Sequence, residues 1–118
     1  MKEYRIALVG FGNVGRALMR LLDAKQDVLR TEFGFTTRVT GIATLRHGMA
    51  INPAGIDTAA ALEIAENDGD LTALSTNPSP ASVLDFIHEV PADVLFENSP
   101  VNHHTGQPAA DHLRAALE

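Results

Sequence analysis

The feature that most constrains the fold of this chain is a glycine-rich segment near its start, Gly10-Phe11-Gly12-Asn13-Val14-Gly15. It follows a short apolar run, residues 4–9, that is typical of a buried β-strand. It also opens an amphipathic stretch that predicts a helix from residue 13 to about residue 31, with Gly34 as the stop. A G-x-G-x-x-G pattern placed between a strand and a helix is typical of a turn that binds a dinucleotide.

In that context each glycine has a separate task. Gly10 permits the tight turn, Gly12 lets the backbone approach a pyrophosphate, and Gly15 lets the helix pack closely on the strand. The free N–H groups and the positive dipole end of the helix would hold the anion. We therefore predict that the whole segment contacts the cofactor: Gly10, Phe11, Gly12, Asn13, Val14 and Gly15. The alternative is a strand, a turn and a helix in which the glycines serve only the turn.

The rest of the chain continues to alternate strands with helices. We expect a turn-rich stretch at 47–55, a break at Asn77-Pro78-Ser79-Pro80 and Asp57 as a helix N-cap. The expected strands are 38–43 and 93–97, and the expected helices are 57 or 58 to 67, 79 or 80 to 89, and 105 to 117. This alternation predicts one α/β domain over residues 1–118, with a partial doubly wound parallel sheet and helices on both faces.

Composition excludes several functional classes. The 118 residues include no cysteine, which excludes a disulfide scaffold, thiolate zinc sites and cysteine nucleophiles. The formal net charge of −6 argues against nucleic acid as a partner. No apolar run is long enough to cross a membrane, and the first residues lack the apolar core of a signal peptide. We therefore expect a cytoplasmic location.

The charge is divided unevenly along the chain. Residues 1–59 carry eight Lys and Arg against five Asp and Glu, whereas residues 60–118 carry one against ten. A basic first half would favour a small anionic ligand there. Solvated helix faces that happen to differ in sign would give the same division.

The residues after the second expected strand bear on which dinucleotide is bound. An NAD site places an Asp or Glu there to accept from the ribose 2′-hydroxyl, but this chain has Ala43-Thr44-Leu45-Arg46-His47. Thr44 can donate to a 2′-phosphate and Arg46 can pair with it bidentately. We therefore predict NADP as the preferred cofactor, with NAD possible. The alternative for Arg46 is an ordinary solvated loop arginine.

The loop after the third expected strand lies at the sheet edge where ligands bind. Ser99 and Asn102 can reach a cofactor there, or they can be turn residues and helix caps. The five histidines show no spacing at which three or four ligands converge, so no metal site is predicted. No nucleophile and base stand at a telling spacing, and we assign no catalytic residue.

Three segments of the chain resemble the N-terminal part of the homoserine dehydrogenase family. They are residues 5–16 around the glycine motif, the segment Asn52-Pro53-Ala54-Gly55-Ile56-Asp57, and residues 93–97 with 99–102 and 105–109. The resemblance runs in order along nearly the whole chain. Differences from the family's pattern lie at Asn98 in place of a small or β-branched residue, and at Ser99 and Val101 in place of threonine.

The resemblance implies a Rossmann-like fold and the NAD(P)-dependent interconversion of L-homoserine and L-aspartate 4-semialdehyde, an oxidoreductase reaction of threonine and methionine biosynthesis. It suggests that residues 10–15 bind the pyrophosphate and that Arg46 lies near the adenosine ribose. It also suggests that Ser99 and Pro100 line the nicotinamide side. The family continues with a further strand and a substrate and dimerisation domain that carries its catalytic residues.

This chain is therefore expected to be a truncated NAD(P)-binding domain that binds cofactor without turnover. Its third strand would present an exposed edge, so we expect a homo-oligomer formed through that edge or through the missing domain. Two other functions remain open: a free-standing module that binds or senses NADP(H), and the cofactor half of another amino-acid dehydrogenase.

Overall fold

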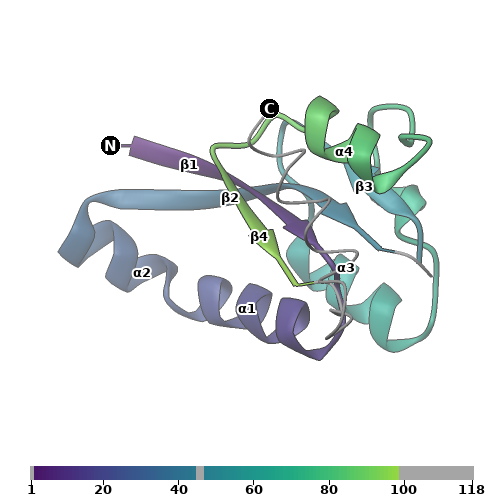
Figure 1. Cartoon of the computed structure of the whole chain (residues 1–118). Coiled ribbons are helices and arrows are strands. Elements are labelled where there is room, and N and C mark those ends of the chain that lie inside the picture. Colours follow the sequence, from purple (N-terminus) through teal and green to yellow (C-terminus); the bar gives the residue numbers. More distant parts are fainter. Residues whose placement is uncertain (1, 45–46, 99–118) are drawn as a thin grey trace, which may run out of the picture.

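A four-stranded sheet forms the centre of the part of the chain described by the computed structural model, residues 2–44 and 47–98. The strands are β1 (Lys2–Val9), β2 (Phe35–Ala43), β3 (Met49–Ile51) and β4 (Val94–Glu97). They lie in the order β3-β2-β1-β4 (Figure 1). β1 is parallel to both β2 and β4, and only the short β3 runs antiparallel, at one edge.

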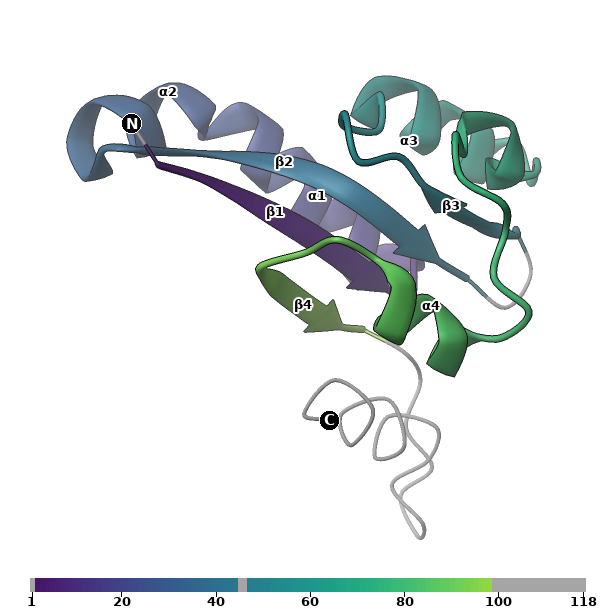
Figure 2. The ribbon, with the colours of Figure 1, turned by 90° about the horizontal axis from the view of Figure 1, so that it is seen from above.

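Helices cover both faces of this sheet, as the α/β pattern predicts. The helical segments are α1 (Asn13–Ala24), α2 (Gln26–Val28), the π-helical η1 (Leu29–Phe33), α3 (Thr58–Glu66), the 3₁₀ segment η2 (Leu71–Leu74) and α4 (Val83–Glu89). Figure 2 shows α1 and α3 behind the sheet and α4 in front of it. None of the helices within residues 2–44 and 47–98 combines the length and the apolar character that a membrane crossing needs.

Successive side chains of β1 point to opposite faces of the sheet, so this strand contributes to the core on both faces. Ile6 and Leu8 point into the cluster that contains Met19 of α1, whereas Ala7 and Val9 point into the cluster that contains Phe86 of α4. A strand buried on both faces reads as a continuous apolar run, which is why the sequence predicts this strand well. The neighbourhood of β1 and the 93–97 strand is also confirmed, because β4 pairs with β1.

The first helix is shorter than predicted. α1 ends at Ala24, and Lys25 has φ −101° and ψ 6° before the chain resumes as α2 and η1. The expectation of one helix from 13 to about 31 was therefore wrong. The side chain of Gln26 bonds to Thr37 at the start of β2, so a tertiary contact fixes the second part of this helical stretch. Gly34 ends it in the left-handed region, φ 73°, as predicted.

Two other predictions on the helices have opposite outcomes. Asp57 caps α3 as predicted, accepting from the Ala60 N–H at 3.1 Å. The expectation that α4 begins at Ser79 or Pro80 was wrong, because α4 begins at Val83. Its cap is Ser82, whose hydroxyl oxygen accepts from the Asp85 N–H at 3.1 Å. Serines 79 and 82 have the same intrinsic cap preference, but the Ser79 hydroxyl donates to the Met49 carbonyl at 3.4 Å instead of capping the helix.

The sequence pattern missed β3 and η2. β3 has only three residues and lies inside the stretch of turn-forming residues, so it shows no periodicity to detect. It pairs antiparallel with the end of β2. The predictions for residues 99–118, namely the loop with Ser99, Pro100 and Asn102 and the helix 105–117, lie outside the described residues.

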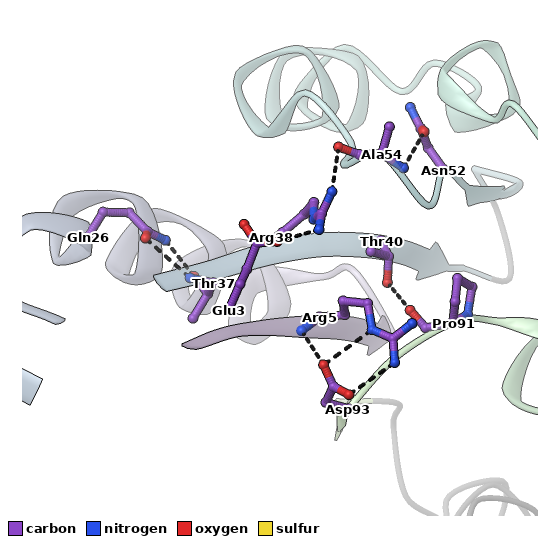
Figure 3. A network of polar contacts seen from close by, with 10 residues as sticks. All are labelled: Glu3, Arg5, Gln26, Thr37, Arg38, Thr40, Asn52, Ala54, Pro91 and Asp93. Atoms are coloured by element: carbon purple, nitrogen blue, oxygen red, sulfur yellow. Dashed lines mark hydrogen bonds and ion pairs between the residues drawn. The ribbon is translucent and has the colours of Figure 1, made fainter. Parts of the chain in front are cut away.

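Polar contacts attach the outer strand and the crossover to the sheet (Figure 3). Arg5 bonds to Asp93 through its backbone N–H, at 2.8 Å, and through its guanidinium, at 3.1 and 3.2 Å. These bonds lower the pKa of Asp93 to about 2. The buried Thr40 hydroxyl donates to the Pro91 carbonyl at 2.8 Å. Both contacts fix the segment just before β4 and so position the carboxyl end of that strand.

Candidate functional site

The glycine segment makes the turn from β1 into α1. Gly10 has φ 93°, a conformation that glycine adopts without strain. Its N–H donates to the Ala43 carbonyl at 2.8 Å, so the turn is attached to the end of β2. A Cβ on Gly15 would lie 2.5 Å from the Gly10 carbonyl oxygen. The first and third glycines are therefore required by the protein's own backbone.

Gly12 is different. Its φ of −84° and ψ of −151° lie in the extended region, and a Cβ built on it meets no atom within 4 Å. Neither the backbone conformation nor the packing within the described residues requires glycine at this position. What the missing side chain leaves is open space directly before the first residue of α1. A dinucleotide pyrophosphate needs such a close approach to the backbone.

The start of α1 has unsatisfied donors. The first intrahelical bond runs from the Arg16 N–H to the Gly12 carbonyl, at 2.9 Å, so the N–H groups of Asn13, Val14 and Gly15 have no partner within the helix. Gly12, as the N-cap, supplies no side-chain acceptor, and the first turn of α1 holds no acidic residue. This end of the helix carries the positive pole of its dipole without compensation.

Arg16 adds a full positive charge at the same place. Its Nε donates to the Gly12 carbonyl and its Nη2 to Asn13 Oδ1, both at 3.2 Å. A cation in the first turn is unfavourable for the helix itself but favourable for a bound anion. Sequence reasoning did not include Arg16 in the site. The available signal was a basic residue in the first helical turn with no acid beside it.

The remaining residues of the predicted segment divide by burial. The Phe11 side chain is 4% exposed and belongs to the core cluster beneath α1, so it anchors the turn and leaves only its backbone for a ligand. Val14 is 67% exposed and Asn13 is also exposed, at the mouth of the open space. The structure thus brings residues 10–15 together at the carboxyl edge of the sheet.

The segment after β2 begins beside this turn. The Thr44 hydroxyl donates to the Gly48 carbonyl at 2.7 Å and accepts from the His47 N–H at 2.8 Å. It therefore closes a short turn that carries Arg46 in its sequence. Arg46 itself lies outside the described residues, and the parts of Thr44 and Arg46 in cofactor binding stay predictions.

The end of β4 completes this edge of the sheet. The Asn98 N–H donates to the Val9 carbonyl at 2.7 Å, so residue 98 lies beside the beginning of the glycine turn. Asn98 Nδ2 is buried and has no hydrogen-bond partner among residues 2–44 and 47–98. Such a donor is costly unless another group accepts from it. Ser99 and Pro100 follow directly but lie outside the described residues, so their predicted contacts are untested.

A separate cleft of about 490 Å³ lies away from the glycine turn, between α1, β2 and residues 54–58. Arg38 lies in its wall, where the guanidinium donates to the Ala54 carbonyl at 3.3 Å and pairs with Glu3 (Figure 3). The Thr58 hydroxyl donates to Asp23 across the same region. Within residues 2–44 and 47–98, no three histidine or acidic side chains gather closely enough to hold a metal ion.

Comparison with known proteins bears directly on this arrangement. The chain is 35% identical over all of its 118 residues to an NAD(+)-dependent homoserine dehydrogenase from Pseudomonas canavaninivorans, of which it spans 34%. It is 35% identical over 108 residues to the homoserine dehydrogenase of Methanocaldococcus jannaschii, of which it spans 32%. The chain is related to the homoserine dehydrogenases. It spans about a third of the length of the curated relatives it matches, and no protein-family model matches it.

Solved homoserine dehydrogenases also share the fold. One is a hyperthermophilic archaeal enzyme in complex with NADPH, which superposes with a TM-score of 0.73 at 27% identity over 98% of this chain and 33% of its own. Another, from Thermoplasma acidophilum, superposes with a TM-score of 0.59 at 26% identity over 86% of this chain and 28% of its own. The Rossmann-like fold predicted from the sequence is thereby confirmed.

Proposed function

We propose that this chain is the dinucleotide-binding part of a homoserine dehydrogenase and binds NADP(H) at the turn between β1 and α1. The observation that carries the proposal is the open space at Gly12, a glycine that the protein needs neither for its backbone conformation nor for packing. The space adjoins three N–H groups that have no partner within the helix, the positive end of a 12-residue helix and a basic side chain.

Each group in this proposal has one task. The N–H groups of Asn13, Val14 and Gly15 donate to the pyrophosphate oxygens, and Arg16 balances their charge. Gly10 and Gly15 hold the turn in the shape that directs these donors outward. The bound nicotinamide supplies hydride transfer. The protein's contribution here is to fix the cofactor's position and to neutralise its phosphates.

We propose NADP as the preferred cofactor, with NAD also accepted. Arg46 would pair with the 2′-phosphate, and no acidic residue directly follows β2 to repel it. The Thr44 hydroxyl already donates its proton to the Gly48 carbonyl and accepts from the His47 N–H, so its contribution is to hold the turn that carries Arg46. The relatives support both parts, since one is named NAD(+)-dependent and a solved neighbour is in complex with NADPH.

At the other end of the cofactor, we propose that Ser99 and Pro100 line the nicotinamide side. Asn98, the residue directly before them, lies beside the start of the glycine turn, since its N–H donates to the Val9 carbonyl at 2.7 Å.

The whole-protein activity proposed is the interconversion of L-homoserine and L-aspartate 4-semialdehyde. It rests on the names of the relatives, because no catalytic residue is assigned within this chain. A free-standing NADP(H) sensor and the cofactor half of another amino-acid dehydrogenase are the alternatives. Matches to two homoserine dehydrogenases, over 100% and 92% of this chain and about a third of each relative, favour the homoserine dehydrogenase function. With L-homoserine and oxidised cofactor, we expect binding but no sustained cofactor reduction; sustained reduction would place catalytic groups inside these 118 residues.

The test is calorimetric titration of the chain with NADPH and, separately, with NADH. Replacing Arg46→Ala should weaken NADPH binding about tenfold to a hundredfold, the equivalent of about 1.5–3 kcal/mol for a lost charge-assisted contact, and leave NADH binding unchanged. Arg30→Ala is the matched control, since Arg30 pairs with Asp27 away from the glycine turn. Unchanged NADPH binding in Arg46→Ala would make Arg46 a solvated loop residue. Failure of the wild type to bind either dinucleotide would refute the proposed site.

A further inference from the structure

His47 joins the turn after β2 to a segment that lies 22 residues further along the chain. Its ring Nδ1 lies 3.0 Å from the Gly69 carbonyl oxygen, and its own carbonyl accepts from the Leu71 N–H at 2.6 Å. Because a carbonyl oxygen only accepts, Nδ1 carries the proton of this bond whether the ring is neutral or charged. The His47 side chain is only 18% exposed, so water competes little for the bond.

The next residue, Gly48, brings the backbone of the turn against the same segment. It has φ 80°, and a Cβ on it would lie 2.4 Å from Asp70 Oδ1. That oxygen accepts from the Thr72 N–H at 2.9 Å at the start of η2. The Thr44 hydroxyl in turn bonds to both His47 and Gly48, so the contacts of these two residues attach the whole turn of residues 44–48.

The segment that receives the turn is itself a continuation of α3. The Gly69 N–H donates to the Ile64 carbonyl at 2.8 Å, and the Asp68 N–H donates to the Ala65 carbonyl at 3.2 Å. α3 in turn buries Ala61 and Ala65 in the core. The turn after β2 therefore rests on an element that the core holds in place, and His47 makes the side-chain contact between them.

We propose that His47 is a positioning residue for the choice of cofactor: by fixing the turn of residues 44–48 on the end of α3, it favours NADPH over NADH. The inference rests on the proposed function, in which Arg46 pairs with the 2′-phosphate. Arg46 directly precedes His47 in the sequence. A side chain on a backbone that is already fixed loses less conformational freedom when it binds its ligand.

The two ends of this argument involve different parts of the cofactor. The pyrophosphate, which NADPH and NADH share, belongs to the glycine turn between β1 and α1. Only NADPH carries the 2′-phosphate, so only NADPH binding gains from a fixed turn after β2. A contact that merely stabilised the fold would affect both dinucleotides alike. The ratio of the two affinities therefore separates a positioning role from a structural one.

The first test is isothermal titration of His47→Ala with NADPH and with NADH. NADPH affinity should fall about twofold to tenfold, the equivalent of one lost hydrogen bond, while NADH affinity stays unchanged. His47→Asn should keep the wild-type ratio, because asparagine Nδ2 lies as many bonds from the backbone as histidine Nδ1 and can donate to the Gly69 carbonyl. Equal weakening of both dinucleotides in His47→Ala, or no weakening, overturns the proposal.

The second test asks whether His47 acts through Arg46. Adding His47→Ala to Arg46→Ala should change NADPH affinity no further, since the group that the turn positions is then absent. A second loss as large as the first would show that His47 acts on the cofactor independently of Arg46, and would overturn the positioning role. A wild type that binds neither dinucleotide refutes the proposed function as well. A preference for NADPH that is lost in Arg46→Ala but kept in His47→Ala refutes this inference alone.

A third variant displaces the turn without touching the histidine. Gly48→Ala places a methyl group against Asp70 and should lower NADPH affinity selectively, as His47→Ala does. Gly34→Ala is the matched control, since Gly34 has a similar φ of 73° but open space around its Cβ position. It bears the same backbone strain and should leave the ratio of affinities unchanged. Scanning calorimetry identifies the temperature at which all variants are folded for the titrations. A wild-type ratio in folded Gly48→Ala contradicts the proposal.

Discussion

The distinct roles of Gly12 and Gly15 give a prediction in which cofactor binding and stability change separately. An alanine Cβ at residue 15 would lie 2.5 Å from the Gly10 carbonyl oxygen, almost an ångström closer than the 3.4 Å at which ordinary contact begins. Both atoms belong to regular backbone, so the strain falls in the upper part of the range for overpacking, about 2–3 kcal/mol. Alanine's better helix propensity offsets about 1 kcal/mol of this.

Gly15→Ala should therefore lose about 1–2 kcal/mol of unfolding free energy, or about 4–8 °C in Tm for a domain of this size. At residue 12 the added Cβ meets nothing and the backbone conformation suits alanine. Gly12→Ala should leave Tm nearly unchanged, because alanine restricts the unfolded chain by about 0.4–1 kcal/mol and this gain offsets its poorer preference for the N-cap position.

For cofactor binding, in contrast, Gly12→Ala should be the damaging substitution. A methyl group on residue 12 occupies the space for the pyrophosphate and removes at least one charge-assisted bond, about 1.5–3 kcal/mol, so NADPH affinity should fall tenfold to a hundredfold. Differential scanning calorimetry and isothermal titration of both variants provide the two readouts. Wild-type NADPH affinity in a fully folded Gly12→Ala variant would refute the reasoning, because the open space would then have no ligand.

Three further predictions concern contacts that hold the sheet and helices in place. Thr40→Val should cost about 1–2 kcal/mol in urea unfolding because it leaves the Pro91 carbonyl without its donor, whereas Thr40→Ser should keep most of that stability. The pKa of Asp93 is lowered to about 2 from 3.8 by its bonds to Arg5, so its contribution is full above about pH 4 and is lost as the pH falls towards 2. The stability gap between the wild type and Asp93→Asn should therefore close over that range, and a constant gap would contradict the assignment. Asp57→Ala should cost about 1 kcal/mol by removing the α3 cap, seen as a lower Tm, and Asp57→Asn should recover most of it.

Sequence reasoning predicted the parts of this fold whose signals are local. The strands β1, β2 and β4 read as apolar runs, and the three glycines could be given separate tasks before their geometry was known. Gly10 and Gly15 have the conformation and the close contact that those tasks require. The whole α/β architecture followed from the alternation of elements, since parallel strands joined by helices leave few other arrangements.

The parts that escaped prediction depend on contacts between distant segments. The break at Lys25 goes with the bonding of Gln26 to Thr37, eleven residues away. β3 needs the end of β2 as its partner, because three residues carry too little pattern of their own. At the candidate site, the use of the Thr44 hydroxyl within its own turn could not be read from residue type. Arg16 could have been found, since a cation at a helix start signals an anion nearby.

The most direct test of the proposed cofactor site is to observe which backbone amides respond to the cofactor. Two-dimensional ¹⁵N–¹H NMR spectra of the chain should be recorded during titration with NADPH. We expect the largest shifts on the amides of Asn13, Val14 and Gly15, with smaller ones at Thr44 and His47. Shifts confined to the cleft around Arg38, or no shifts at all, would contradict it.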